Sequence, residues 1–229
     1  MMRTSRRPLL IGTLCLAAAS VASIALRAQG GATPPAAAQP QPRAPASKPA
    51  QTPVRAGSEV NKADGEFMSG MIPHHAQAVI MAGWAPSHGA REDVRILCER
   101  IVVGQRDEIA MMQTWLDDRG LPVPDAKSTR HKMTMNGVEH EMLMPGMLTD
   151  EEMAQLDKAR GSDFDRLFLV GMIKHHQGAI DMVDVLFKSY GAAQDETVFR
   201  FASDVYADQG TEIERMEKML ATVPGGRKQ

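Results

Sequence analysis

The chain repeats one fifteen-residue segment, which reads FMSGMIPHHAQAVIM at positions 67–81 and FLVGMIKHHQGAIDM at positions 168–182. The two copies align without gaps, and eight of the fifteen positions are identical. Unrelated segments would share about one position, so an internal duplication is the simplest explanation. A second match follows each copy: QRDEIAMM at 105–112 and QGTEIERM at 209–216 share Gln, Glu-Ile and Met. Each half is therefore predicted to be a helix with a His-His pair, a turn and a second helix.

Both second helices show one inward face. Their apolar and motif residues recur in steps of four and three, the spacing of an amphipathic helix. These residues are Val94, Cys98, Ile101, Gln105, Glu108, Met112 and Trp115, and then Val198, Ala202, Val205, Gln209, Glu212, Met216 and Met219. Because neither helix pair can bury its apolar face alone, we predict an all-α fold, an antiparallel four-helix bundle built from two duplicated helix pairs.

Local signals place the helix boundaries. Ser162, followed three residues later by an aspartate, is predicted to open the third bundle helix, and Gly191 to separate it from the fourth. Thr149 and Glu152 have the spacing of a capping box and predict a short helix between the halves. Pro73 is expected to kink the first helix or to mark its start.

The N-terminal region has the composition of an export leader and a linker. Residues 1–28 begin with three arginines and continue in an uncharged apolar run, which predicts a signal peptide, with an uncleaved anchor as the alternative. Residues 29–57 contain seven Pro and eight Ala and are predicted to be a disordered linker. The bundle is then expected to occupy residues 58–223, in the periplasm or another part of the cell envelope outside the cytoplasm.

Charge and cysteine content narrow the function classes. The formal net charge is −2, and without residues 1–28 the chain carries 22 Lys and Arg against 28 Asp and Glu. An acidic chain without a basic stripe is a poor nucleic-acid binder. Of the two cysteines, Cys15 lies in the leader, so Cys98 alone cannot form an internal disulfide and is expected to be a small buried side chain.

The repeated segments combine imidazole and thioether groups. On each first helix the His-His pair has a Met about one turn before it and another Met seven residues after its first histidine. Imidazole binds copper, zinc, iron and nickel, whereas thioether selects Cu(I). Copper is therefore the predicted metal, with Cu(I) favoured over Cu(II), and the candidate ligands are Met71, His74, His75, Met81, Met172, His175, His176 and Met182. The alternative is hydrogen-bonded core histidines with methionines as packing.

The Gln, Glu and Met residues of the repeated motif on the second helices are candidates for a supporting role. They are acceptors that orient the histidines, or direct ligands, or residues at an exposed end of the bundle that reach water. This group comprises Gln105, Glu108, Met112, Gln209, Glu212 and Met216.

The segment between the halves is rich in methionine. Its Met-x-Met pairs are typical of flexible loops that capture soft metals, although methionines that cover an open bundle edge would look similar. The segment spans residues 130–153 and holds His131, Met133, Met135, His140, Met142, Met144, Met147 and Met153. The lone His88, in a turn between helices, is expected to be solvent-exposed.

These motifs resemble the ferritin-like bacterial family called domain of unknown function 305, whose members include CopM-type periplasmic copper-binding proteins. The resemblance covers about residues 64–220 and rests on both His-His segments, both Gln-x-x-Glu-Ile-x-x-Met motifs and the sequence MPGML at 144–148. It implies a four-helix bundle, export, and copper binding or resistance through the eight His and Met candidates. The first half departs from the family pattern, because Ala-Gln-Ala follows its His pair where Gln-Gly-Ala is usual.

Three functions are therefore compared. The first is a non-enzymatic protein that buffers, sequesters or transfers copper, with the metal ion and other envelope copper proteins as partners. The second is a di-iron oxidase, which needs Glu-x-x-His on two helices; that motif does not occur in the sequence. The third is a metal-free scaffold that uses its methionines as an adaptable contact surface.

Overall fold

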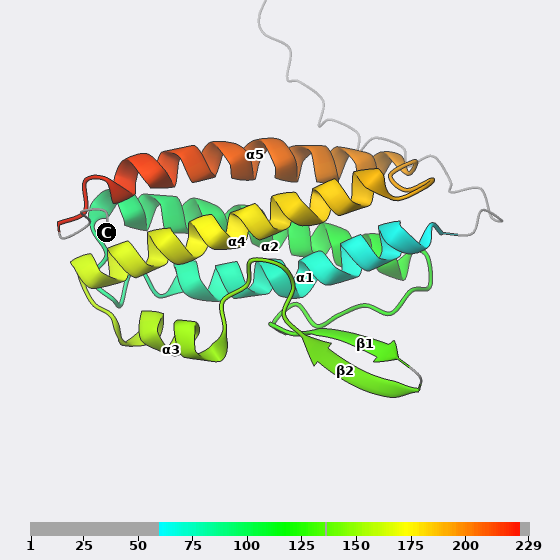
Figure 1. Cartoon of the computed structure of the whole chain (residues 1–229), viewed down its shortest axis with the longest axis horizontal. Helices are drawn as coiled ribbons and strands as arrows, with labels where there is room; N and C mark the ends of the chain where they lie inside the picture. The colour runs from blue at the N-terminus through cyan, green and yellow to red at the C-terminus, as the bar shows by residue number, and fades with distance from the viewer. Residues whose placement is uncertain (1–59, 136, 225–229) are drawn as a thin grey trace, which may run out of the picture. The chain divides into compact units, whose positions relative to one another are not determined.

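The computed structural model describes residues 60–135 and 137–224. The predicted signal peptide (1–28) and linker (29–57) lie outside the described residues. The described part contains helices α1 (Lys62–Gly83), α2 (Glu92–Asp117), α3 (Asp150–Lys158), α4 (Ser162–Lys188) and α5 (Glu196–Leu220), and a hairpin of β1 (His131–Met135) and β2 (Val138–Met142) (Figure 1). Among these helices, none is both long enough and apolar enough to cross a membrane.

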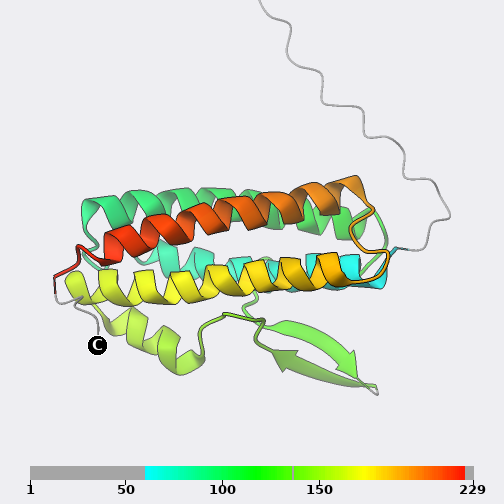
Figure 2. The ribbon, with the colours of Figure 1, turned by 45° about the horizontal axis from the view of Figure 1, so that its top comes forward.

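The four long helices form the predicted bundle. Helix α1 packs against α2, α4 packs against α5, and the two pairs meet mainly where α1 contacts α4. Figure 2 shows α1 and α4 in one layer and α2 and α5 in the other, with α3 and the hairpin outside the α1/α4 layer. The predicted all-α, antiparallel four-helix bundle is thus confirmed, with the hairpin as an addition that the sequence reading did not include.

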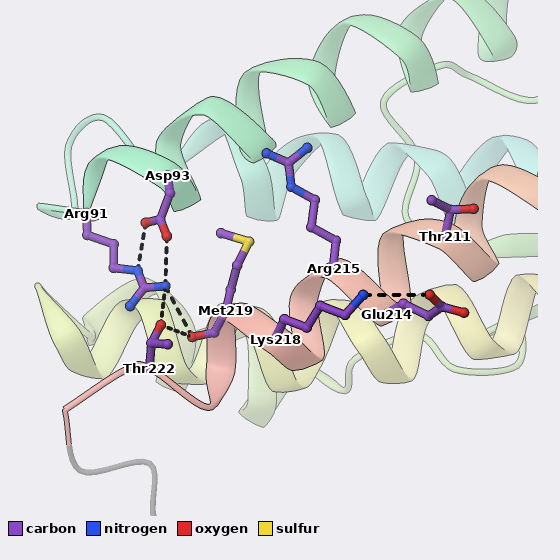
Figure 3. Close-up of a pocket in the computed structure, with 8 residues that line it drawn as sticks. All are labelled: Arg91, Asp93, Thr211, Glu214, Arg215, Lys218, Met219 and Thr222. Carbon is purple, nitrogen blue, oxygen red and sulfur yellow. Dashed lines mark hydrogen bonds and ion pairs between the residues drawn. The ribbon is translucent and has the colours of Figure 1, made fainter.

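Polar contacts at both ends fix α2 antiparallel to α5. At one end, the Arg91 guanidinium donates to the carbonyl oxygen of Met219 at 3.1 Å and to the Thr222 hydroxyl at 2.9 Å (Figure 3). At the other end, the Trp115 indole N–H donates to the Asp195 carboxylate at 3.2 Å. Asp195 is also the N-cap of α5, so one carboxylate begins the helix and ties it to α2.

The core is divided into two apolar clusters by a polar layer. All four long helices contribute to both clusters, and each passes from one cluster to the other at its candidate site residues. On α1 and α4 the change occurs at the His-His pairs, and on α2 and α5 it occurs at the Gln and Glu of the repeated motif. The predicted inward seams are buried along their length, apart from the partly exposed Glu108 and Glu212. The histidines therefore lie in the middle of the bundle rather than at an end.

The predicted helix boundaries are confirmed with one correction. The Thr149 hydroxyl accepts from the Glu152 N–H at 3.2 Å and the Glu152 carboxylate accepts from the Thr149 N–H at 2.8 Å, which completes the capping box. Helix α4 begins at Ser162, but its N-cap is Gly161, which has no side chain to accept a hydrogen bond. Pro73 lies inside α1, so it does not mark the start of the helix.

Candidate metal centre

The two His-His pairs meet in the middle of the bundle. The ring centroids of His74 on α1 and His175 on α4 are 3.8 Å apart, with the ring planes tilted by 41°. Within each pair the two rings are 6.2 Å apart, because consecutive helical residues point about 100° away from each other. All four histidines are fully buried. The structure therefore brings the duplicated imidazoles into one interior layer.

The inner histidines donate to backbone carbonyl groups. The Nε2 atom of His74 lies 3.0 Å from the carbonyl oxygen of Pro145, and the Nε2 atom of His175 lies 3.0 Å from the carbonyl oxygen of His74 itself. A carbonyl oxygen can only accept, so Nε2 carries the proton in both rings. In a neutral imidazole the other nitrogen, Nδ1, is then a free lone pair.

The outer histidines donate to carboxylates of the repeated motif. The His75 Nε2 atom lies 2.8 Å from Glu108 Oε2, and the His176 Nε2 atom lies 2.7 Å from Glu212 Oε2. The two halves thus contain the same histidine–glutamate pair with closely similar geometry. Of the three alternatives for these glutamates, the structure excludes the exposed bundle end, because both carboxylates accept from buried histidines in the middle of the bundle.

Six acceptor atoms in this layer are buried and have no hydrogen-bond partner among the described residues. They are the Nδ1 atoms of His74, His75, His175 and His176 and the Oε1 atoms of Gln105 and Gln209. Buried acceptors without a partner are rare in folded proteins and often mark an ion or water site. Since Nδ1 is the free nitrogen in all four rings, it is the atom available to bind a metal.

Burial keeps the inner imidazoles neutral. Desolvation, followed by the charge of neighbouring His75, lowers the pKa of His74 to about 3. Desolvation and then His74 lower the pKa of His175 well below its usual value. A neutral imidazole needs no deprotonation before it binds a metal, so at neutral pH these rings are in the ligand form.

The low pKa of His74 predicts acid sensitivity of the metal-free protein. The unfolded chain takes up a proton at His74 below about pH 6.5, whereas the folded chain does not until about pH 3, so stability rises with pH across this window. At pH 5 this one group should cost about 2 kcal/mol relative to pH 7. Urea unfolding at both pH values should show a loss that is larger by about this amount in the natural chain than in His74→Asn. Equal losses in the two proteins would contradict this assignment.

The methionines lie on both sides of the histidine layer. Met71, Met182 and Met112 belong to one apolar cluster, whereas Met172, Met81 and Met216 belong to the other. Each cluster therefore combines the Met that precedes one His pair with the Met that follows the pair of the other half. The sequence analysis predicted that both candidate methionines of a half lie near the histidines of that half. The structure instead groups each methionine that precedes a His pair with the methionine that follows the pair of the other half.

The donor set is mixed rather than a preformed nitrogen and oxygen cage. Within residues 60–135 and 137–224, no three His, Cys, Asp or Glu side chains are arranged around a common point that could hold a metal ion. The buried imidazoles of the layer and the thioethers of the two clusters beside it are the donor types that soft ions prefer.

Comparison with known proteins decides the family. The model of the domain of unknown function DUF305 matches residues 64–220. The chain belongs to the DUF305 family. The stretch that matches is the one in which the sequence motifs suggested the resemblance, and it includes both His-His pairs.

Solved DUF305 structures have the same fold. A protein from Streptomyces coelicolor, named as a secreted protein, is 32% identical, with a TM-score of 0.58 over 69% of this chain and 92% of its own. A fragment from Deinococcus radiodurans is 26% identical, with a TM-score of 0.58 over 72% of this chain and 99% of its own. CopM in its Cu(I)-bound form is 26% identical, with a TM-score of 0.54 over 71% of this chain and 98% of its own.

One curated relative matches over a shorter stretch. Uncharacterized protein L153 of Acanthamoeba polyphaga mimivirus is 34% identical over 58 residues, which is 25% of this chain. The match covers 38% of that protein, so the chain spans little more than a third of the length of this relative.

The DUF305 chain carries a strap, residues 144–148, across the α1/α4 layer. The Gln77 side chain donates to the Leu148 carbonyl at 2.9 Å and accepts from the Leu148 N–H at 2.7 Å. In the second half Gly178 takes the position that matches Gln77, and a Cβ there would lie 2.0 Å from the Pro145 carbonyl oxygen. The departure from Gln-Gly-Ala in the first half therefore has a structural reason: one half binds the strap with an amide and the other makes room for it.

Two expectations about the remaining His and Met residues were wrong. His88 is buried rather than exposed: its Nδ1 pairs with the Ser87 hydroxyl at 2.9 Å, and its Nε2 donates to the Asp157 carbonyl at 2.9 Å. The methionine-rich segment is not a plain loop, because β1 and β2 pair His131 with Met142 and Met133 with His140. Met147 is buried against the bundle, whereas Met142 on the hairpin is exposed.

A surface pocket lies between α2 and α5. It occupies the cleft between the start of α2 and the end of α5 and is lined by Arg91, Asp93, Thr211, Glu214, Arg215, Lys218, Met219 and Thr222 (Figure 3). One end of the pocket is at Arg91, which precedes Gln105 by fourteen residues or about 20 Å along a helix, and the other end is at Thr211, next to Glu212 in the sequence. Its lining is mainly charged, and its described contacts join α2 to α5, so we assign it to the bundle's architecture rather than to the metal centre.

Proposed function

We propose that this DUF305 protein binds copper in its helical core, through Nδ1 atoms of the His-His pairs and thioether sulfur of the flanking methionines. The observation that carries the proposal is the set of four buried Nδ1 atoms that have no partner among the described residues, with every Nε2 already bonded to protein oxygen. Bound copper would satisfy these acceptors without any change in the protonation of the rings.

The solved relatives support copper as the metal. CopM, which shares 26% identity with this chain, has been crystallised in Cu(I)-bound, Cu(II)-bound and silver-bound forms. Silver(I) and Cu(I) are both soft ions, and the present chain lines both sides of its histidine layer with buried methionines. We therefore favour Cu(I) over Cu(II) for the core.

The role we propose is to buffer, sequester or transfer copper in the cell envelope, without catalysis. The leader-like residues 1–28 and the description of the Streptomyces coelicolor relative as a secreted protein favour export. Thioether ligands form no disulfides, so they suit an oxidising compartment. Both glutamates of the layer accept from histidines, which gives them an orienting role rather than that of a general base.

The thioether contribution can be tested with volume-conserving substitutions. Met172→Leu combined with Met182→Leu removes one sulfur from each cluster, and we expect the Cu(I) affinity of the leaderless chain to fall about tenfold or more. Competition with a chromogenic Cu(I) chelator measures this affinity. Met219→Leu is the matched control, because Met219 is a buried methionine near the end of α5, away from the histidine layer. An unchanged affinity in the double variant would remove the thioether argument.

The scaffold alternative makes a different prediction. A ligand that binds only the folded state must raise the melting temperature, so Cu(I) should stabilise the natural chain by an amount that grows with the logarithm of its affinity. If added Cu(I) does not change the melting temperature, and the protein takes up no Cu(I) in competition with the chelator, the metal-free scaffold is favoured. Turnover with tightly bound iron would favour the oxidase.

A further inference from the structure

Two matching glycines show how the two halves of the metal centre meet. Gly70 and Gly171 occupy the same position of the repeated segment, four residues before the first histidine of each pair. A Cβ on Gly70 would lie 3.5 Å from Met182 Cε, and a Cβ on Gly171 would lie 3.4 Å from Met81 Cε. A methionine of the other half thus packs against each glycine. Helices α1 and α4 therefore cross with approximate two-fold symmetry about the histidine layer.

The strap breaks this symmetry at the two glycines. Beside Gly70 it places Met144, whose Cε and Sδ atoms would lie 2.8 Å and 3.6 Å from a Cβ at that position. Beside Gly171 it places Leu148, whose Cδ2 and Cδ1 atoms would lie 3.1 Å and 3.5 Å from the equivalent point. At Gly70 the strap therefore adds a second methionine beside α1, whereas at Gly171 it adds the hydrocarbon side chain of Leu148 beside α4.

Met144 is held next to His74 by its own backbone. The residue that follows it, Pro145, accepts the Nε2 proton of His74 at 3.0 Å. Gly70, which Met144 contacts, lies about one helical turn before His74 on α1. Met71 and Met182 are buried in the same cluster, and Met144 packs against that cluster while remaining partly exposed. Met144 thus adds a partly exposed thioether to the buried Met71, Met112 and Met182 at the His74 end of the layer.

We propose that Met144 is a further thioether ligand, and that it makes the His74 end of the centre bind Cu(I) more tightly than the His175 end. The inference rests on the proposed copper function and adds to it a residue that distinguishes the two halves. A soft monovalent cation is the ligand this chemistry selects, because the added donor is a neutral sulfur. At the His175 end the side chain of Leu148 can supply no such donor.

An exchange of the two strap residues tests the proposal. Met144→Leu gives the first end the chemistry of the second, and we expect the most tightly bound Cu(I) to be released to a chelator about tenfold more readily. Leu148→Met adds a sulfur at the second end, and in the Met144→Leu background it should recover a substantial part of the lost affinity. Both changes nearly conserve volume, and melting temperatures of the metal-free variants check that the fold is intact.

The outcomes separate the two proposals. If the natural chain takes up no Cu(I), the proposed function itself is wrong and this inference falls with it. If the natural chain binds Cu(I) and Met144→Leu leaves its affinity within twofold of the Met219→Leu control, only the role of Met144 is overturned. A tenfold loss in Met144→Leu that Leu148→Met restores in part would establish the inequivalent ends.

Discussion

Replacing His75 and His176 together by asparagine is expected to lower the Cu(I) affinity of the protein by more than about a hundredfold. Each substitution removes one imidazole from one pair, so both ends of the centre lose a nitrogen ligand. The amide oxygen of asparagine is a hard donor and does not replace the imidazole for Cu(I). Competition with a Cu(I) chelator measures the loss, and silver(I) serves as a second soft probe.

The double variant should still fold. Glu108 and Glu212 accept from these histidines, but their side chains are 31% and 25% exposed, so each carboxylate can turn to water when its partner is removed. The variant therefore leaves no fully buried unpaired charge. His88→Asn and His140→Asn are the controls, because one removes a buried histidine whose two nitrogens are already bonded and the other an exposed histidine of the hairpin. An affinity in the double variant equal to that of the controls would exclude the outer histidines as ligands.

Gly178→Ala is expected to destabilise the protein by about 2 kcal/mol, although alanine normally stabilises a helix relative to glycine. A Cβ at residue 178 would lie 2.0 Å from the Pro145 oxygen and 2.6 Å from the Gly146 Cα, and both are backbone atoms that cannot rotate away. The strap must therefore lift from α4, which also weakens the hydrogen bond from His74 to Pro145. Urea unfolding of the metal-free protein measures the change.

A matched substitution isolates the strap contact. Gly104 lies inside α2, and a Cβ there would meet nothing within 4 Å. Gly104→Ala should therefore stabilise the protein by roughly 0.5–1 kcal/mol through helix propensity alone. If Gly178→Ala stabilised the protein by a similar amount, the close packing of the strap on α4 would be contradicted.

The parts of the fold that were predictable from sequence depend on local, repeated signals. The seam from Val94 to Trp115 follows helical spacing, and its duplication in the second half removes the ambiguity that one amphipathic segment would leave. Thr149 and Glu152 satisfy each other within one turn, so the capping box needs no tertiary contact. The placement of the His-His pairs followed from the same periodicity, because a bundle of four such helices must face its seams inward.

The parts that were missed depend on tertiary contacts or on a short signal given too little weight. His88 is buried because Asp157, far away in the sequence, supplies the acceptor for its ring, and no local pattern reports that contact. The hairpin was predictable, because the sequence has an Asn-Gly dipeptide at positions 136–137, a strong turn signal, and Glu139 and Glu141 alternate with Val138, His140 and Met142 after it. It was missed because its methionines were interpreted as part of a metal-capturing loop. The strap could be suspected from Gly178 only once α4 was known to pass beneath Pro145.

The candidate ligands themselves came from residue chemistry, and the fold adds which atoms are free. Sequence spacing placed one His-His pair on the first helix of each half, and the structure adds that all four rings are buried and all four donate through Nε2. Two kinds of acceptor make this possible. The inner rings donate to backbone carbonyl groups of α1 and of the strap, and the outer rings donate to the motif glutamates. Those partners lie on other segments, so sequence alone could not assign the free nitrogen.

Nitrogen-15 NMR of histidine-labelled protein, recorded before and after one equivalent of Cu(I) or silver(I), tests the central claim most directly. Metal-free protein should show the Nε2-protonated tautomer in the four paired histidines, and the metal should then shift Nδ1 resonances of those rings while leaving His88 and His140 unchanged. Shifts confined to the hairpin histidines, or binding through Nε2, would contradict a copper centre in the core of this bundle.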